Sequence, residues 1–449
     1  MKKKPENTFH IISLGCAKNL VDSHSYAQLL RKNHLIETES FAKAKFILVN
    51  TCGFIHDARE ESYETVREAA KRKKPGQKLV VTGCLSERYK EEMLKQVEGI
   101  DGLIGTRNLK DLATLIAALG AQSALPLAHF PEYQRIVNQT DLNACAIQGA
   151  SAYLKIADGC RRTCAYCAIP NIKGSLVSRP LAQVIEDALF LQAEGVQEIN
   201  LIAQDPTDYG LDLYGKPAFT NLLEELLPQI AQVPWVRILY AFPGFESKKL
   251  TKLMLNHANL LHYLDLPLQH ASPKVLKSML RPSDIGWVRQ TIKEMRQQIP
   301  DLVVRTTFIV GFPTETEADF QMLKDFVKEM HFDHFGVFTY SPEEGTPAAS
   351  LGDPIPHQVK EARRMELMEM QSKLSFKKQV SLVGKEFDMI VEGSDPSQNI
   401  LIGRNWRCAP EVDGLIIAKG AQAGLPFTRV RITGVTGPDL YAEQIPDPV

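Results

Sequence analysis

Three cysteines stand at C-x3-C-x2-C spacing, at Cys160, Cys164 and Cys167, directly after the apolar run Tyr153–Ala157. Soft thiolates at this spacing can hold three irons of a 4Fe–4S cluster and leave the fourth iron open to another ligand. With 8 Cys in 449 residues, chance alone would give roughly 0.003 such triplets per chain, so the spacing indicates function. Zinc is the alternative, but a zinc site closes with four ligands, usually from two paired knuckles, and the sequence has no second C-x2-C pair. The triplet therefore favours an iron–sulfur cluster.

The first part of the chain alternates short apolar runs with segments of helical spacing. Buried strands are predicted at Phe9–Leu14, Phe46–Asn50 and Leu79–Thr82. Helices with charged faces are predicted between them, at Val21–Lys32, Ala58–Arg72 and Glu87–Val97. This alternation predicts an amino-terminal parallel α/β sheet domain covered by helices.

Three further cysteines, Cys16, Cys52 and Cys84, lie just past the carboxyl ends of these predicted strands. The carboxyl ends of parallel strands meet at one edge of an open sheet, where ligands bind. The three thiols can therefore converge on one point and hold a second cluster. The alternative is three buried, inert cysteines, which is a common fate of free thiols. Because the residue type repeats at the same topological place, the sequence favours the second cluster.

Residues 151 to about 345 repeat a strand followed by a helix. Strands are predicted at Tyr153–Ala157, Glu198–Ala203, Val236–Ala241, Tyr263–Pro267, Val303–Gly311 and His334–Tyr340. Helical segments such as Ala182–Glu194 and Glu317–Glu329 separate them. Six such units predict an incomplete (β/α)6 barrel, with the reacting groups on the loops that follow the strands. The C-x3-C-x2-C triplet occupies the first of these loops.

The last part of the chain changes character. Pro342–Pro356 is a connection that contains Pro and Gly, and His357–Leu382 has the spacing of a long amphipathic helix. Short β runs punctuated by Gly and Pro then predict a small antiparallel β-barrel, at Phe387–Val391, Asn399–Ile402, Leu415–Ala418, Thr428–Thr433 and Leu440–Gln444. The predicted domains span residues 8–125, 146–380 with the linking helix, and 383–449.

The composition is that of a folded protein in a reducing compartment. The chain is 44% hydrophobic and 23% charged, and its net charge of −1 gives no sign of a nucleic-acid-binding tail. No apolar run reaches the roughly 18 residues of a membrane span, and no apolar segment follows the basic start as in a signal peptide. Eight cysteines are too sparse for a disulfide framework, which predicts reduced thiols and a cytoplasmic location. Cys145 and Cys408 have no partner pattern and are interpreted as structural.

Motifs in all three parts resemble those of the radical S-adenosylmethionine methylthiotransferases. The three amino-terminal cysteine motifs of that family are similar to Ser13–Ser23, Val49–Ile55 and Thr82–Leu85. Its radical motif is similar to Asp158–Pro170 followed by Ser178–Pro180, and its TRAM domain to Gly403–Arg404 and Ala409–Gly414. The resemblance runs over nearly the whole chain in the same domain order.

The residues after the cysteines resemble one branch of this family. In the ribosomal-protein branch, RimO, the residues that follow the first two cysteines are similar to Ala17–Val21 and Gly53–Ile55 of this chain. The tRNA branch, typified by MiaB, has Gln-Met-Asn after its first cysteine. The stretch Lys173–Arg179 also lacks the Arg-Gly-x-Glu run that is usual in the tRNA enzymes. His24 stands where the family usually has an acidic residue, but it lies beside the helix rather than at a ligand, so we expect the chemistry to be intact.

The resemblance implies methylthiolation of the β-carbon of one aspartate in the twelfth protein of the small ribosomal subunit. That carbon has no acidic proton for a base to remove, so a cofactor must supply a radical. The implied cofactors are S-adenosylmethionine (SAM) and two 4Fe–4S clusters. The cluster on the triplet at 160–167 would cleave SAM reductively, the cluster on the other three cysteines would hold the sulfur, and a second SAM would supply the methyl group. The implied partners are a basic ribosomal protein and an electron donor such as flavodoxin or ferredoxin, without a membrane or a nucleic-acid substrate.

Four further residues are candidates for contacts with cofactor or substrate. Tyr166 lies between two of the ligands and could stack beside SAM, although plain packing is the alternative. Gln204 and Asp205 follow the second barrel strand, at the end of the barrel where chemistry is expected. Gly311 ends the fifth strand and could bring the backbone close to the adenosine, although a turn alone would also explain it.

The carboxy-terminal segment is acidic. Residues 381–449 contain six Lys/Arg and nine Asp/Glu, a balance of −3. An RNA-binding module normally neutralises phosphates with a basic face, so an acidic barrel favours a basic protein as partner. Two other functions remain open: the same chemistry on a tRNA adenosine, and a non-catalytic iron–sulfur scaffold. The substrate that gains mass would identify the first, and failure to cleave SAM would identify the second.

Overall fold

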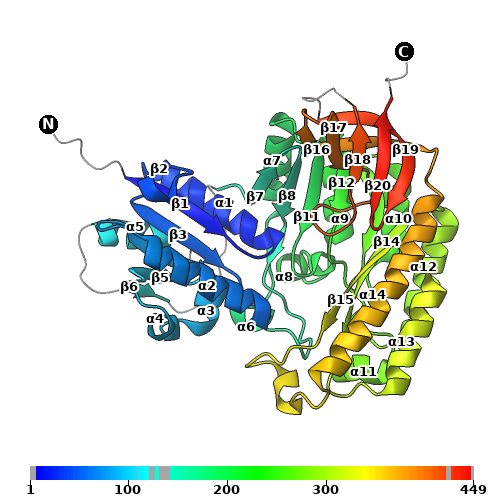
Figure 1. Cartoon of the computed structure of the whole chain (residues 1–449), viewed down its shortest axis with the longest axis horizontal. Helices are drawn as coiled ribbons and strands as arrows, with labels where there is room; N and C mark the ends of the chain where they lie inside the picture. Colours follow the sequence, from blue (N-terminus) through cyan, green and yellow to red (C-terminus); the bar gives the residue numbers. More distant parts are fainter. Residues whose placement is uncertain (1–6, 108, 121–126, 131–141, 421–425, 446–449) are drawn as a thin grey trace.

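The computed structural model describes residues 7–107, 109–120, 127–130, 142–420 and 426–445 of the chain. These residues form an amino-terminal sheet domain, a central domain of strands and helices, and a small carboxy-terminal barrel (Figure 1). The predicted α/β class and the order of the three parts are confirmed. In the part of the chain that the structure describes, no helix is both long enough and apolar enough to cross a membrane.

The amino-terminal domain is a parallel sheet flanked by helices. Its strands are β1 Thr8–Ser13, β2 Ile36–Glu37, β3 Phe46–Thr51, β4 Lys78–Gly83, β5 Gly102–Ile104 and β6 Leu127–His129. Its helices are α1 Ala17–Lys32, α2 His56–Arg72, α3 Cys84–Tyr89, α4 Glu92–Gln96 and α5 Asp111–Gly120. The sheet has the order β2-β1-β3-β4-β5-β6, so the three predicted strands are neighbours in it. One prediction is wrong: the segment expected as a single helix at 87–97 forms α3 and α4, because Lys90 has a φ of 46° that an α-helix does not accommodate.

The central domain is built on an open, mostly parallel sheet. Its strands are β7 Cys145–Gln148, β8 Ser151–Lys155, β11 Glu198–Ile202, β12 Trp235–Ile238, β13 Leu260–Asp265, β14 Val303–Val310 and β15 His334–Thr339. They have the order β15-β14-β13-β12-β11-β8-β7. The strands from β8 to β15 pair in parallel, whereas β7 pairs antiparallel with β8. The predicted incomplete (β/α)6 barrel is therefore confirmed, with β7 added at one edge.

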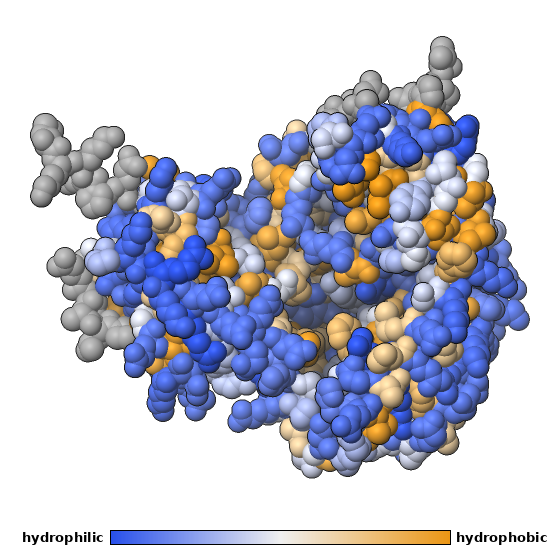
Figure 2. Space-filling view, viewed as in Figure 1, coloured by the Kyte–Doolittle hydropathy of each residue, from blue (hydrophilic) through white to orange (hydrophobic). Residues whose placement is uncertain are grey.

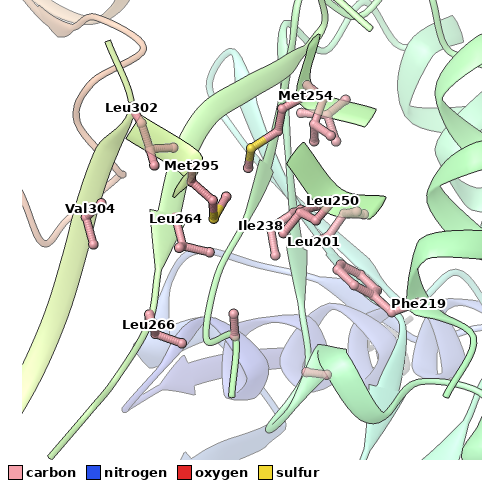
Figure 3. Close-up of a cluster of buried hydrophobic side chains, with 14 of the residues drawn as sticks. Leu201, Phe219, Ile238, Leu250, Met254, Leu264, Leu266, Met295, Leu302 and Val304 are labelled. Atoms are coloured by element: carbon pink, nitrogen blue, oxygen red, sulfur yellow. The ribbon is translucent and has the colours of Figure 1, made fainter. Parts of the chain in front are cut away.

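The longer helices of this domain cover the outside of the sheet (Figure 1). They are α7 Leu181–Ala193, α9 Phe219–Gln229, α10 Ser247–Asn256, α12 Ile285–Gln298 and α13 Glu317–Met330. The short helices α6 Ile169–Lys173, α8 Leu211–Tyr214 and α11 Pro273–Ser278 lie in the loops between strands, and α6 contacts α3 of the amino-terminal domain. Shorter elements are β9 Ala157–Asp158, β10 Val177–Ser178, and the 3₁₀ turns η2 Pro206–Asp208 and η3 Pro347–Leu351. Figure 3 shows how strand side chains such as Leu201 and Ile238 meet Phe219 and Met254 of the helices. Each such fully buried side chain stabilises the fold by about 1.5–3 kcal/mol, which keeps the strand ends in fixed positions.

A second apolar cluster runs through the interior of the barrel. Tyr153, Tyr263 and Val303 form part of it on the inner side of the sheet. Helix α1 adds Val21, and the carboxy-terminal domain adds Ile390. The amino-terminal domain thus packs against the inside of the barrel near the loops that follow the strands, and the carboxy-terminal domain packs near the strand starts.

The carboxy-terminal domain is a closed barrel that follows the long helix α14 His357–Val380. Its strands are β16 Glu386–Asp395, β17 Ile400–Arg404, β18 Ile416–Lys419, β19 Phe427–Thr436 and β20 Asp439–Gln444. The predicted small barrel is confirmed, and its pairings are antiparallel except between β18 and β20. Those two strands run parallel because β20 forms a hairpin with β19 before it closes the barrel against β18.

Candidate active site between two cysteine triads

The amino-terminal triad, Cys16, Cys52 and Cys84, lies at the carboxyl edge of the first sheet. Cys16 directly precedes α1, Cys52 follows β3, and Cys84 begins α3. A Cβ atom on Gly15 would lie 2.9 Å from Cβ and 3.2 Å from Sγ of Cys52. A Cβ atom on Gly53 would lie 2.8 Å from the carbonyl carbon of Cys84. The three cysteine loops therefore approach so closely that side chains would not fit at these two glycines.

One amide side chain links these loops. The Nδ2 atom of Asn19, in the first turn of α1, donates to the carbonyl oxygens of Leu14 and Thr51, both at 3.0 Å. Its Oδ1 atom lies 3.5 Å from Sγ of Cys84. Asn19 therefore contacts the loops of all three cysteines and fixes their spacing. An asparagine at the start of a helix is the only signal of this role in the sequence.

The barrel triad, Cys160, Cys164 and Cys167, occupies the loop after β9. The N–H of Cys160 donates to the carbonyl oxygen of Gly174, and the N–H of Cys167 donates to that of Cys164, both at 3.0 Å. Nη1 of Arg281 lies 3.8 Å from Sγ of Cys164. Arg281 therefore places a positive charge beside the barrel triad, and no motif in the sequence indicates this arginine.

Four of the six triad thiols are shielded from water, which disfavours their ionised form. Burial raises the pKa of Cys160 to about 11 and that of Cys167 to about 12. Burial also raises the pKa of Cys52 and Cys84. Among the described residues, no three Cys, His, Asp or Glu side chains close around a single metal ion. Each thiolate of a 4Fe–4S cluster binds a different iron, so two separate sets of three soft donors fit two clusters better than one ion.

Gln204 and Asp205 lie beside the barrel triad, after β11. Nε2 of Gln204 donates to Asp158 at 3.1 Å, while its Oε1 is buried and has no hydrogen-bond partner within the described ranges. The carboxylate of Asp205 accepts from Nε of Arg162 at 2.8 Å and from the backbone N–H of Thr207 at 3.0 Å. Gln204 therefore has an acceptor to offer a ligand, whereas Asp205 holds the arginine that lies inside the triad loop.

Tyr166 and Gly311 have protein neighbours that account for their positions. Tyr166 packs against a buried cluster of Ala165, Val275, Met279, Phe312, Tyr340 and Ala348. Burial raises the pKa of its phenol well above the ordinary value. Gly311 has a φ of 74°, its N–H donates to Glu315, and a Cβ there would lie 2.3 Å from Cγ of Lys360. The turn and the lysine therefore explain the glycine without a nearby adenosine.

A buried network of charges joins the two domains. Nζ of Lys173, after the barrel triad, donates to Asp22 of α1 at 2.7 Å and to Thr106 at 2.6 Å. Nζ of Lys155 bonds to Asp22 as well and lies 3.2 Å from Asp158. Burial alone would lower the pKa of Lys173, but Asp158 and Asp22 raise it well above its usual value. The ammonium groups therefore stay charged and hold the two triad-bearing segments together.

A cavity of about 130 Å³ opens beside this network. Its lining includes Tyr26, Lys155, Lys173, Arg179 and Gln183. In the part of the chain that the structure covers, none of the six triad cysteines lines it. It has room for several water molecules. Figure 2 shows that the surface is hollowed between the amino-terminal domain on the left and the barrel on the right.

Lys18 reaches the barrel from the first turn of α1, two residues after Cys16. Its Nζ lies 3.7 Å from the centroid of the Tyr240 ring, just past β12. Tyr240 has a φ of 71°, and its N–H donates to Asp265 at 3.0 Å, which fixes the ring. Burial alone would lower the pKa of Lys18, but Tyr240, Cys16 and Asp265 raise it. In the sequence alone Lys18 is only part of a motif, and nothing there indicates its position beside Tyr240.

Three segments of the chain match known families. Residues 8–105 match the family described as "Uncharacterized protein family UPF0004", residues 154–327 match the radical SAM superfamily, and residues 383–445 match the TRAM domain.

Full-length relatives share about two fifths of their residues with this chain. A protein of Syntrophotalea carbinolica is 43% identical over 438 residues, which cover 96% of each chain. A protein of Lachnoclostridium phytofermentans is 41% identical, with 96% of this chain and 98% of that one covered. A protein of Citrifermentans bemidjiense is 40% identical, with 99% of each covered. All three carry the name ribosomal protein uS12 methylthiotransferase RimO.

Solved structures share the fold at low sequence identity. The radical SAM methyltransferase TsrM of Kitasatospora setae has a TM-score of 0.55 at 13% identity, covering 76% of this chain and 73% of that one. The cobalamin-dependent SAM radical enzyme OxsB has a TM-score of 0.52 at 10% identity, covering 77% and 54%. At these identities the likeness shows the fold alone.

Proposed function

Since the chain belongs to the RimO branch of the radical SAM methylthiotransferases, we propose that it methylthiolates the β-carbon of one aspartate in ribosomal protein uS12. The assignment of uS12 as the substrate rests on the similarity to uS12 methylthiotransferases along all three domains, at 39–43% identity. The acidic balance of the carboxy-terminal barrel supports a basic protein partner.

We assign one 4Fe–4S cluster to each cysteine triad. The donor sets support this assignment, because each offers three soft thiols and no fourth. When bound, the cluster of the barrel triad would supply the electron that cleaves SAM, that of the amino-terminal triad would hold the sulfur, and a second SAM would supply the methyl group.

The protein's own side chains bind SAM and orient the loops of the two triads. The unpaired Oε1 of Gln204 is suited to accept a hydrogen bond from the amino group of SAM. Arg162 and Arg281 place positive charge beside the barrel triad, which offsets the negative charge of three thiolates. Asn19 holds the amino-terminal loops, and the pair of Lys173 and Asp22 keeps them facing the barrel.

Exclusion of water is the other contribution of the chain. Ala17 and Val21 of α1 pack against the interior of the barrel with Ile202 and Leu239. Reactive carbon-centred species would be quenched by side reactions in open solvent, so an apolar seal between the domains protects the reacting carbon.

The substrate is tested by direct competition. Reconstituted enzyme with SAM and a reductant is given equal amounts of uS12 and unmodified tRNA, and the methylthio product on each is measured by mass spectrometry. We expect product on uS12 alone. Product only on tRNA would contradict the assignment of uS12 as the substrate and would favour the MiaB-like function.

The scaffold alternative and the reductant are tested separately. A scaffold would not cleave SAM, so deoxyadenosine formation under reducing conditions contradicts that function. We propose that a flavodoxin or a ferredoxin delivers the electrons. Replacing a chemical reductant by each protein in turn should support turnover with at least one of them.

A further inference from the structure

Lys18 carries a charge that has no anionic partner. Its Nζ lies over the face of Tyr240, and within the described ranges no oxygen acceptor is in hydrogen-bond or ion-pair distance of it. The residue as a whole keeps part of its surface exposed, so Lys18 borders open space rather than the core. Contact with an aromatic face fixes a cation in place but leaves its N–H donors free for another group.

The carboxylates nearest to Lys18 are occupied by other cations. Asp265 accepts from Nη1 of Arg305 at 3.3 Å and from the backbone N–H of Tyr240 at 3.0 Å. Asp158 pairs with Lys155 at 3.2 Å and accepts from Gln204. Neither carboxylate therefore depends on Lys18 as its partner.

The other cations around the barrel triad are already bound. Arg161 and Arg162 pair with Asp208 at 2.7 and 2.8 Å, and Arg162 also pairs with Asp205. Arg281 donates to the carbonyl oxygen of Pro267. Lys18 thus differs from Arg161 and Arg162, whose guanidinium groups are paired with carboxylates. Nε of the buried Arg281 also has no partner within the described ranges, but that arginine lies on the barrel side, against Cys164.

The position of Lys18 works against local stability. A cation in the first turn of a helix opposes the helix dipole, and the first turn of α1 contains no acidic residue to compensate. A residue that breaks a local preference without a structural gain points to function.

We infer that Lys18 binds the side-chain carboxylate of the residue that the enzyme modifies. The inference rests on the proposed function, in which that residue is an aspartate. The reacting β-carbon is bonded directly to the carboxylate carbon, so an ammonium group that holds the carboxylate also sets the direction of the β-carbon. Adenosine offers no anion at the reacting base, so the same lysine favours a protein substrate over tRNA.

The contact is tested by a double-mutant cycle of binding. Reconstituted holoenzyme without reductant is titrated against labelled uS12 and against uS12 whose target aspartate is replaced by asparagine. Wild-type enzyme should bind the asparagine form about tenfold more weakly, as expected for the loss of one charged hydrogen bond. Lys18→Met should bind both forms with the weaker affinity. Lys18→Arg should restore most of the preference for aspartate.

Three controls separate the possible outcomes. Lys95→Met, an exposed change on α4, should leave the preference intact. Iron content should be unchanged in Lys18→Met, which shows that the triad loop is still folded.

The α-carboxylate of SAM is the other carboxylate in the site, so SAM affinity is measured without uS12. If Lys18→Met weakens SAM binding and affects both uS12 forms equally, the inference is overturned. If wild-type enzyme modifies uS12 without preferring aspartate in binding, the role of Lys18 fails but the proposed function stands; if uS12 is not modified at all, the proposed function fails.

Discussion

Nζ of Lys173 lies 2.7 Å from a carboxylate oxygen of Asp22, which joins the segment after the barrel triad to the helix that begins beside Cys16. The two residues are 151 positions apart in the sequence. Their side chains are 4% and 10% exposed, so the contact is made in a region of low dielectric constant. Because Asp22 lies in the helix that follows Cys16 and Lys173 lies in the helix that follows Cys167, this pair couples the two triad-bearing segments.

Replacing Lys173 by Met should therefore uncouple the two triads. Asp22 and Asp158 would lose one cation, and breaking a buried pair on one side costs about 3 kcal/mol of unfolding free energy. We expect the variant to form more deoxyadenosine per methylthio product than wild type, because SAM cleavage needs only the barrel triad. Product ratios and the denaturation midpoint measure the two effects.

The matched control is Lys373→Met on α14. Lys373 pairs with Glu369, but its side chain is 74% exposed, so the stability loss should be within about 0.5 kcal/mol. Its product ratio should equal that of wild type. An unchanged product ratio in Lys173→Met would show that the pair is not needed to orient the triads.

Cluster loading is the second prediction. Two sets of three thiols should hold two 4Fe–4S clusters, so anaerobic reconstitution should give about eight irons per chain. Changing Cys160, Cys164 and Cys167 together to Ala should leave about four, measured by iron and sulfide analysis. A wild-type value that never exceeds four contradicts the two-cluster assignment.

The third prediction separates the roles of the triads. Changing Cys16, Cys52 and Cys84 to Ala should spare deoxyadenosine formation and abolish sulfur insertion, because the radical originates at the other triad. Chromatography of deoxyadenosine and mass analysis of uS12 measure both. If the variant still gives methylthio product, the sulfur comes from elsewhere.

The strands around both triads could be predicted from the sequence because each is a short, continuously apolar run. Phe46–Thr51, for example, is buried at every position. The ends of the predicted strands then indicated where the six cysteines lie, because the loops that follow parallel strands share one edge of a sheet. The strands β2, β5 and β6 contain only two or three residues and left no periodic signal.

The polar groups that position the triads could not be predicted in the same way. Asn19 reaches Thr51 across 32 positions, and Arg281 reaches Cys164 across 117. Such contacts depend on how distant segments meet in space, and neither periodicity nor spacing in one sequence contains that information. A buried ammonium group such as that of Lys173 looks like any surface lysine until its partners are placed.

Acid stability is the fourth prediction, and it concerns Glu198 at the junction of barrel and carboxy-terminal domain. Glu198 is fully buried between Arg237, 2.9 Å away, and Arg404. Burial alone would raise the pKa of Glu198, but the two arginines lower it to about 2. A lowered pKa in the folded state adds stability above the unfolded value of 4.5, and this is lost as pH falls toward 2. The loss should be on the order of 3 kcal/mol.

Glu198→Gln measures this contribution by difference, because the pKa of other buried carboxylates such as Asp413 is also lowered, there by His334 and Arg305 against the effect of burial. The variant should be less stable at pH 7, since two buried arginines lose their anion. The difference in unfolding free energy between variant and wild type should become smaller as the pH falls from 4.5 to 2, measured by urea denaturation at each pH. A constant gap across that range would mean that Glu198 does not titrate as proposed.

The last prediction concerns the outer face of the carboxy-terminal barrel. Deleting the domain is not a clean test of docking, because Arg404 and Asp413 are buried against the barrel, where Asp413 accepts from Tyr263 at 2.6 Å. The exposed strand residues are better probes. Asp388 on β16 and Glu443 on β20 are both exposed and lie on strands that flank β19.

Changing Asp388 and Glu443 together to Lys should weaken uS12 binding at low salt, because exposed complementary charges attract a basic partner mainly during encounter. We expect a decrease of about threefold to tenfold, chiefly in the association rate, that disappears as salt is raised. The control is the double charge reversal of Glu91 and Glu92 to Lys, two exposed residues at the start of α4 in the amino-terminal domain, which should change binding little. Surface plasmon resonance at several salt concentrations measures both rates. Arg429 and Arg431 pair with Glu386 on the same face, so part of the charge of this face is already balanced. An unchanged association rate in the double variant would mean that this face does not attract uS12 and that uS12 docks elsewhere.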